Sequence, residues 1–146
     1  MRLHTLIPAL LALSACDLID PKPVEGDVVV VAKAPASFTH NHENHVLAIS
    51  VGSLVARSYP QEYGREPKYT APYSIFTNRP FTFKDEIILT CDVYDGDNIL
   101  VGGAGLVVDR APTGGIVEFR LTHIIEAGRI VCRATSGEGF TRKAFP

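Results

Sequence analysis

The sequence predicts an all-β domain, namely an antiparallel β-sandwich of about seven to eight short strands, immunoglobulin-like or transthyretin-like. Short runs rich in β-branched and apolar residues recur at regular spacing, and turn-forming residues separate them. Almost no stretch has helical periodicity. Residues 27–146 are numerous enough to enclose a single hydrophobic core, so one domain is expected there.

Eight segments carry the strand pattern. The first holds four successive valines between Gly26 and Pro35, and the second changes phase near Gly52, which predicts a bulge. The clearest alternation lies in 86–94, and the Asp-Gly-Asp-Asn sequence at 95–98 predicts a hairpin turn after it. Only 122–128 indicates a helical turn. The expected strands are 27–34, 45–57, 70–77, 81–83, 86–94, 99–108, 115–121 and 129–134.

The first residues have the organisation of a secretory signal. Arg2 precedes an apolar run over 6–13 that is about half the length of a membrane-spanning helix. The sequence Leu13-Ser14-Ala15-Cys16 then resembles the bacterial lipobox. The resemblance implies a signal peptide over 1–15 and a lipidated Cys16 that carries palmitate-type acyl chains, enough for stable membrane attachment. The alternatives are an ordinary secretory signal with an incidental cysteine, or a buried N-terminal strand.

The segment 16–26 is acidic and contains Pro21 and Pro23, so it is expected to be an extended tether. The protein would then be held at the bacterial cell envelope and face the periplasm. Asp17 is similar to the inner-membrane retention signal of enteric lipoproteins, which leaves the choice between inner and outer membrane open. The formal net charge of −2 is too weakly acidic for general affinity to nucleic acid or anionic lipid, and removal of Arg2 makes it one unit more negative.

Two cysteines remain when Cys16 is assigned to the lipid. Cys91 and Cys132 both lie in strand patterns on the apolar face, in a chain expected to be secreted into an oxidising compartment. We therefore expect a disulfide within or between sheets, with two buried free thiols as the alternative. The two cysteines do not form the Cys-x-x-Cys motif of a redox-active pair.

A histidine cluster lies between the first two expected strands. In an extended backbone His40 and His42 point the same way, and His45 or Glu43 could add a third ligand if the chain bends, so the cluster could hold Zn²⁺ or Cu²⁺. The alternative is a solvated turn, because Asn and His tolerate turn conformations.

The segment 57–80 concentrates tyrosine and basic residues and contains four prolines. Tyr and Arg dominate interaction hot spots, and proline lowers the entropy that such a loop loses on binding. The sequence therefore predicts a partner-binding surface, or else a long connection whose tyrosines cover the end of the sandwich. The candidate contact residues are Arg57, Tyr59, Tyr63, Arg65, Lys68, Tyr69 and Tyr73.

From about Val46 to Val108 the chain resembles the small β-sandwich lipoproteins related to the type III secretion pilotin. The resemblance rests on a strand that ends near Val55, on the sequence Pro80-Phe81-Thr82-Phe83, and on the strand over 87–93 with Asp95-Gly96 and the apolar run 99–101 after it. It implies that the domain binds a protein subunit such as a secretin.

The sequence contains no catalytic constellation, so a non-enzymatic envelope lipoprotein that binds a protein partner, with no cofactor, is expected. The second hypothesis is a periplasmic metal- or small-ligand-binding lipoprotein that uses His40, His42 and His45.

Overall fold

The computed structural model describes residues 26–58, 64–123 and 125–137. The expected signal peptide, Cys16 and nearly all of the tether lie outside these residues, as do Tyr59 and Tyr63. The strands of the described residues are β1 (Val28–Lys33), β2 (Phe38–His42), β3 (His45–Val51), β4 (Leu54–Arg57), β5 (Lys68–Phe76), β6 (Phe81–Tyr94), β7 (Leu100–Ala111), β8 (Thr113–Leu121) and β9 (Gly128–Ser136).

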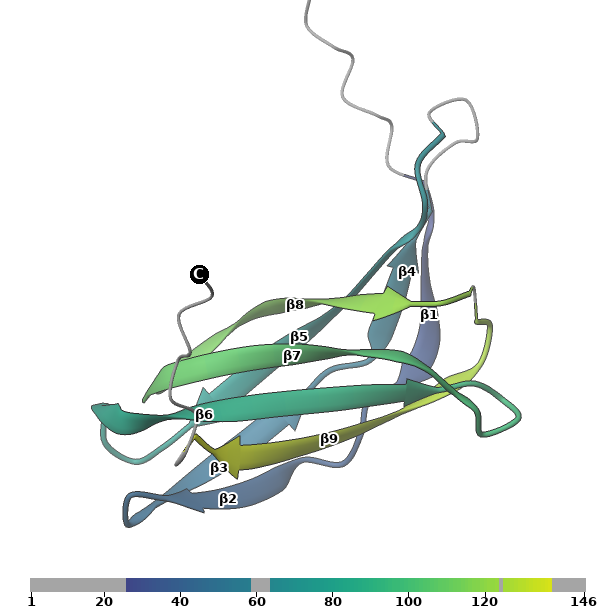
Figure 1. The fold of residues 1–146 in the computed structure, drawn as a ribbon. Coiled ribbons are helices and arrows are strands. Elements are labelled where there is room, and N and C mark those ends of the chain that lie inside the picture. The colour runs from purple at the N-terminus through teal and green to yellow at the C-terminus, as the bar shows by residue number, and fades with distance from the viewer. Residues whose placement is uncertain (1–25, 59–63, 124, 138–146) are drawn as a thin grey trace, which may run out of the picture.

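These strands form one sheet that closes on itself (Figure 1). The order is β2-β3-β5-β4-β1-β9-β6-β7-β8, and β8 pairs again with β5. Seven strands therefore make a closed barrel, to which β2 and β3 are added. All pairings are antiparallel except that of β1 with β9, which is parallel and joins Ala32 to Gly128 and Lys33 to Arg129.

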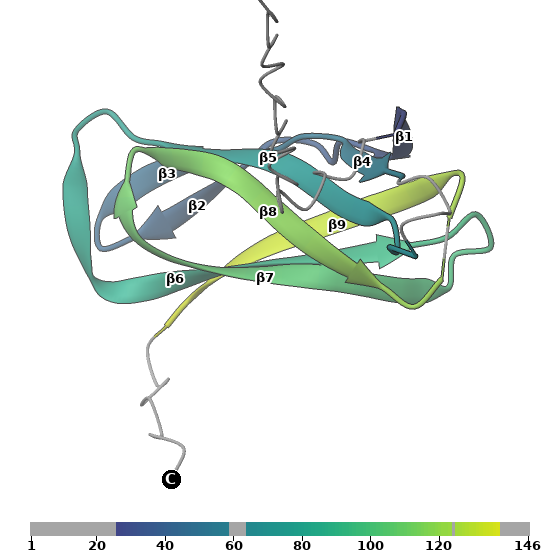
Figure 2. The same ribbon diagram turned by 90° about the horizontal axis from the view of Figure 1, so that it is seen from above.

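The all-β, mostly antiparallel prediction is confirmed, whereas the prediction of a sandwich of the immunoglobulin or transthyretin kind is wrong. The main reason is that the strands of the two would-be layers pair with each other twice. The β1–β9 contact makes them one sheet, and the ladder between β5 and β8, which runs from Tyr69↔Phe119 to Ile75↔Thr113, closes that sheet on itself. From above, β5 and β3 run along one side of the molecule, β6 and β7 run along the other, and β8 crosses obliquely (Figure 2). The barrel is therefore flattened. Its strands alternate inward-facing apolar and outward-facing polar side chains, as the strands of a sandwich do.

Two glycines stand where strands approach closely. At the interruption between β3 and β4, Gly52 donates its N–H to the carbonyl oxygen of Pro72 at 2.7 Å, and a Cβ there would lie 2.5 Å from the proline ring. β3 and β4 both pair with β5, so the predicted bulge in 45–57 is confirmed. Gly102 has φ +154° and pairs with Leu121 where β7 meets β8; a Cβ there would lie 2.0 Å from the carbonyl oxygen of Arg120.

Other predicted elements differ in their limits. The expected strands 81–83 and 86–94 are one strand, β6, with a shift in its register to β7 between Thr82 and Ile87. β2 was missed, because its histidines and asparagine favour a turn. The helical turn predicted over 122–128 is wrong, since the described residues there are bends that lead into β9.

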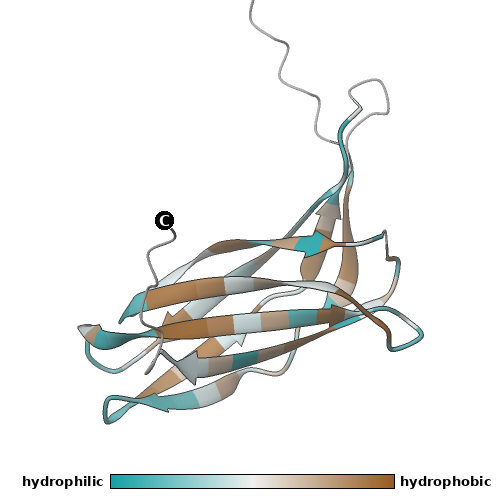
Figure 3. Ribbon diagram, viewed as in Figure 1, coloured by the Kyte–Doolittle hydropathy of each residue, from teal (hydrophilic) through white to brown (hydrophobic). Residues whose placement is uncertain are grey.

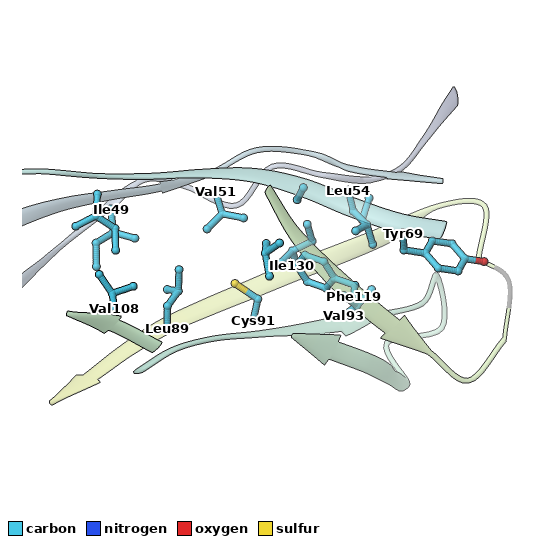
Figure 4. Packing of buried hydrophobic residues seen from close by; sticks show 14 of the residues in the cluster. Ile49, Val51, Leu54, Tyr69, Leu89, Cys91, Val93, Val108, Phe119 and Ile130 are labelled. Carbon is cyan, nitrogen blue, oxygen red and sulfur yellow. The ribbon is translucent and has the colours of Figure 1, made fainter. Parts of the chain in front are cut away.

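The core fills the flattened interior (Figure 4). Brown and teal alternate along much of the sheet, so many strands place apolar side chains inward and polar side chains outward (Figure 3). Among the most deeply buried side chains are Leu47, Ile49, Leu54, Ile75 and Ile87.

The expected disulfide is confirmed. Cys91 and Cys132 face each other in the ladder of β6 and β9, and their sulfur atoms are 2.07 Å apart. The bond closes a loop with a sequence separation of 41 residues and ties the last described strand to the core.

Replacing Cys91 and Cys132 together with alanine should lower the free energy of unfolding by about 4 kcal/mol, because the cross-link no longer restricts the unfolded chain. Urea unfolding measures the change. A reductant should destabilise the natural protein and leave the double variant unaffected; equal stability of the two proteins would contradict the prediction.

Candidate functional site

The partner-binding residues predicted from the sequence are brought together only in part. Arg57 pairs with Lys68 across β4 and β5, and the next pair along the ladder is Ala56 with Tyr69. Arg65 lies in the segment that precedes β5. Tyr73 lies farther along β5, where it pairs with Val51, and is half-buried.

The start of β1 lies beside Arg57 and is unusually apolar for an exposed strand. Val28, Val29 and Val30 are exposed by 51%, 56% and 55%. β1, β4 and the start of β5 rise together away from the other strands at this end of the barrel (Figure 1). The β9 contact begins only at Ala32. The valines are therefore outside the core, although their sequence is typical of a buried strand.

The strand register places basic and apolar side chains on one face. Val28 is opposite Arg57, and Arg57 is opposite Lys68, so the three share the outer face of the sheet, with Val30 two residues along. Lys68 makes an exposed ion pair with Glu118 at 3.5 Å. We call Val28, Val30, Arg57 and Lys68 the valine–basic patch; Val29 is exposed on the opposite face of β1, in register with Ala56.

A cavity of about 480 Å³ opens at the same end of the barrel. Tyr69 forms part of its wall and points past the ends of the strands (Figure 4). Its side chain is 7% exposed, and its hydroxyl has no hydrogen-bond partner among the described residues. Burial, and then the negative charge of Glu66, raise the pKa of Tyr69. The other lining residues are Glu66, Pro67, Arg120, Leu121, Thr122 and His123.

Some polar groups of this cavity already have partners. The Thr122 hydroxyl donates to the carbonyl oxygen of Val101 at 3.1 Å, which leaves its oxygen to accept from Nδ1 of His123 at 3.2 Å. Nε2 of His123 lies 3.8 Å from a carboxylate oxygen of Asp95. Within the described part of the chain, Arg120 and Glu66 have no ion-pair partner.

The histidine cluster lies at the opposite end of the barrel, and most of its polar groups have protein partners. His42 is 4% exposed; its Nε2–H donates to the carbonyl oxygen of Asp85 at 2.7 Å, and its Nδ1 accepts from the Ser136 hydroxyl at 3.0 Å. These bonds connect β2 to β6 and β9. His42 can therefore bind a metal only if it gives up one of these bonds.

The other two histidines are held by ring contacts. His45 donates from Nδ1 to the Glu43 carbonyl oxygen at 2.8 Å and stacks on Phe81, with ring centroids 3.7 Å apart. His40 stacks beside His42, with centroids 6.1 Å apart, and burial and then the neighbouring His42 lower its pKa. In the residues that the structure describes, no three His, Cys, Asp or Glu side chains are grouped so as to hold a metal ion.

Glu43 completes this end of the barrel. It lies with Asn44 in the left-handed turn between β2 and β3, and its Oε1 accepts the backbone N–H groups of Lys84 at 2.7 Å and Asp85 at 3.0 Å. These hydrogen bonds stabilise the carboxylate and lower the pKa of Glu43. The sequence pattern gives no signal for this contact, because the residues that it joins are some forty positions apart.

Comparisons with protein families, curated proteins and solved structures found no match to this chain. No helix in residues 26–58, 64–123 and 125–137 has the length and apolarity needed to cross a bilayer.

Glu43→Gln should cost stability at neutral pH, because the amide oxygen is a weaker acceptor for the two backbone N–H groups. A lowered folded-state pKa contributes stability that is complete above the ordinary value of 4.5 and is lost as the pH falls through the lowered value. The stability difference between natural protein and variant should therefore vanish on acidification. Urea midpoints from pH 7 to pH 3 measure it, with Glu118→Gln as the control for loss of an exposed carboxylate; a difference independent of pH would count against this role.

Proposed function

We propose that this protein is a non-enzymatic bacterial envelope lipoprotein, anchored through lipid on Cys16, that faces the periplasm and binds another envelope protein. It acts as an assembly or pilotin-like factor for a secretion or surface complex. The lipobox-like sequence at 13–16 supports the anchor. The exposure of Val28 and Val30 on the same face as Arg57 and Lys68 is the observation that supports partner binding.

The physical argument concerns apolar area. Single exposed apolar side chains are ordinary, but contiguous ones rimmed by polar groups mark interaction surfaces. Val28 and Val30 are about half exposed, so covering both completely would contribute on the order of 1.5 kcal/mol to an interface core. Arg57 and Lys68 favour a partner surface that is acidic around an apolar centre.

The backbone of β1 adds a second means of recognition. β1 pairs with β4 along one edge, whereas among the described residues its other edge meets β9 at Ala32 and Lys33 alone. An unpaired strand edge can accept a strand from another chain, and main-chain hydrogen bonds then add to the side-chain contacts.

The position of the patch suits an anchored protein. The expected tether ends at Gly26, directly before β1, and a segment of ten or so residues reaches at most about 35 Å. The valine–basic patch would therefore lie at the tethered end of the domain, within reach of a partner in or near the membrane. The metal-binding alternative with His40, His42 and His45 is not favoured, since both ring nitrogens of His42 are engaged.

Replacing Val28, Val29 and Val30 together with threonine should reduce partner capture at least about tenfold while changing stability little, since threonine keeps the strand preference and the sites are exposed. The lipidated protein is crosslinked mildly in envelope membranes, affinity-purified and analysed by quantitative mass spectrometry.

Val107→Thr with Ile116→Thr is the matched control, since these residues are exposed by 56% and 74% on β7 and β8. An envelope subunit enriched by the natural protein and the control, but lost with the triple variant, is the expected result. Equal enrichment by all three would exclude the patch.

A further inference from the structure

The outer face that β3, β5 and β8 share is apolar and uncharged over most of its length. Strand alternation turns every second residue outward, and the register aligns these residues from strand to strand. The outward positions at 46–50 on β3, 70–76 on β5 and 114–116 on β8 hold no charged residue. We call the central members of this set the uncharged face, namely Val46, Ala48, Pro72, Ser74, Phe76 and Ile116.

The apolar side chains of this face are well exposed and adjacent to one another. Val46 is exposed by 62%, Phe76 by 60% and Ile116 by 74%. Phe76 is opposite Ala48 in the ladder of β3 and β5, and Ile116 is opposite Pro72 in the ladder of β5 and β8. Contiguous exposed apolar side chains mark a surface that is covered by a partner or a membrane.

The layer of β6 and β9, on the other side of the barrel, has a different outer face. Arg133 and Asp92 form an ion pair there at 2.6 Å, and the guanidinium carbon of Arg129 lies 4.6 Å from the ring centroid of Tyr94. Charged groups are therefore part of that face, as is usual for a surface in contact with water.

A row of basic residues borders the uncharged face at the end where β1 begins. Arg57 is opposite Lys68, and Arg120 is one step beyond the last pair of the ladder between β5 and β8, which brings it to the same row. Glu118 offsets one of the three charges, because its carboxylate lies 3.5 Å from Nζ of Lys68. The row is therefore net positive, although the whole chain has a formal net charge of −2.

The chain enters the domain beside this basic row. Gly26 donates its N–H to the carbonyl oxygen of Ser58, the residue after Arg57, at 2.9 Å. The starts of β1 and β4 rise on the side of the barrel on which β8 lies (Figure 1). A lipid on Cys16 would be ten residues from Gly26, and such a segment reaches at most about 35 Å. The position of the anchor therefore points to a lipid surface as the occupant of the uncharged face.

We propose that the uncharged face docks on the surface of an anionic bilayer, with Phe76 and Ile116 in the interfacial region and the basic row against lipid phosphates. Buried apolar area and attraction to anionic lipid are the two contributions that hold a protein at such an interface. The inference rests on the lipid anchor of the proposed function and adds an orientation to it. Docking would hold the valine–basic patch at the level of the headgroups, where a membrane partner can meet it.

Spin labels on the lipidated full-length protein test the docking in vesicles of about 30% phosphatidylglycerol in phosphatidylcholine. An introduced cysteine can be labelled selectively, because Cys91 and Cys132 form the disulfide and Cys16 carries the proposed lipid. Ser74→Cys places a label on the uncharged face and leaves its apolar side chains intact. Val107→Cys is the matched control, because Val107 is exposed by 56% on β7.

The label at position 74 should collide more with oxygen, which concentrates in the bilayer, than with a water-soluble nickel chelate, and the label at 107 should show the reverse. Arg120→Gln should lower the ratio of docked to undocked protein about fivefold, as expected for one basic side chain near an anionic surface. Arg110→Gln, on β7, is the control for loss of an exposed arginine and should leave the ratio unchanged. Ile116→Ser should lower the ratio as well, whereas Val107→Ser should not.

Each other outcome overturns a definite part of the account. Equal access of the nickel chelate to both labels, in protein whose Cys16 is acylated by mass spectrometry, would reject docking and leave the anchor standing. An unacylated Cys16 would reject the anchor and the docking that rests on it. Shielding of the label at 74 from both reagents, with dipolar broadening between labels, would assign the face to a second copy of the chain and overturn the proposal.

Discussion

The ladder between β5 and β8 is the constraint on which the rest of the molecule depends. β5 pairs with β3 and β4 along one edge and with β8 along the other, so it closes the sheet into a barrel by a seven-pair ladder. The short parallel contact between β1 and β9 closes the ring on the other side. Because that contact involves only two residue pairs, the start of β1 leaves the barrel and its valines are exposed.

The two ends of the barrel differ in how their polar groups are satisfied. At the end formed by β2, β6 and β9, His42 and Glu43 bond to the backbone of Lys84 and Asp85 and to Ser136. This is the behaviour expected of groups that hold a structure together. At the other end, the Tyr69 hydroxyl has no such bond among the described residues, and charged side chains border an open cavity. Nε2 of His40 at the first end is also buried without a partner in the described residues, so what distinguishes the second end is its open cavity with charged side chains at the border.

The sequence was sufficient for the local features of the fold. Alternation located most strands, the phase change near Gly52 located the break between β3 and β4, and the apolar positions of Cys91 and Cys132 predicted the disulfide. The sequence could not predict the closed barrel, because the alternation of apolar and polar residues along β8 is the same whether β8 pairs with β5 or forms the edge of an open sheet. That choice depends on contacts between residues far apart in the chain.

The candidate site was predictable to a similar degree. Tyrosine and basic residues drew attention to the end of the domain for which partner binding is proposed, but Tyr69 is buried and is not the exposed contact that was expected. The valines at 28–30 were assigned only to a strand, since four successive apolar residues are typical of burial on both faces. His42 was placed in a metal site or a solvated turn, because its partners, Asp85 and Ser136, cannot be identified from spacing.

The central claim is that partners bind at the end of the barrel that carries Val28. Site-specific photo-crosslinking in living cells tests it most directly, with a benzophenone amino acid at position 28 and, separately, at the exposed position 116 on β8. The account predicts a discrete crosslinked adduct with one envelope protein from position 28 and none from position 116. Adducts from position 116 alone would contradict it.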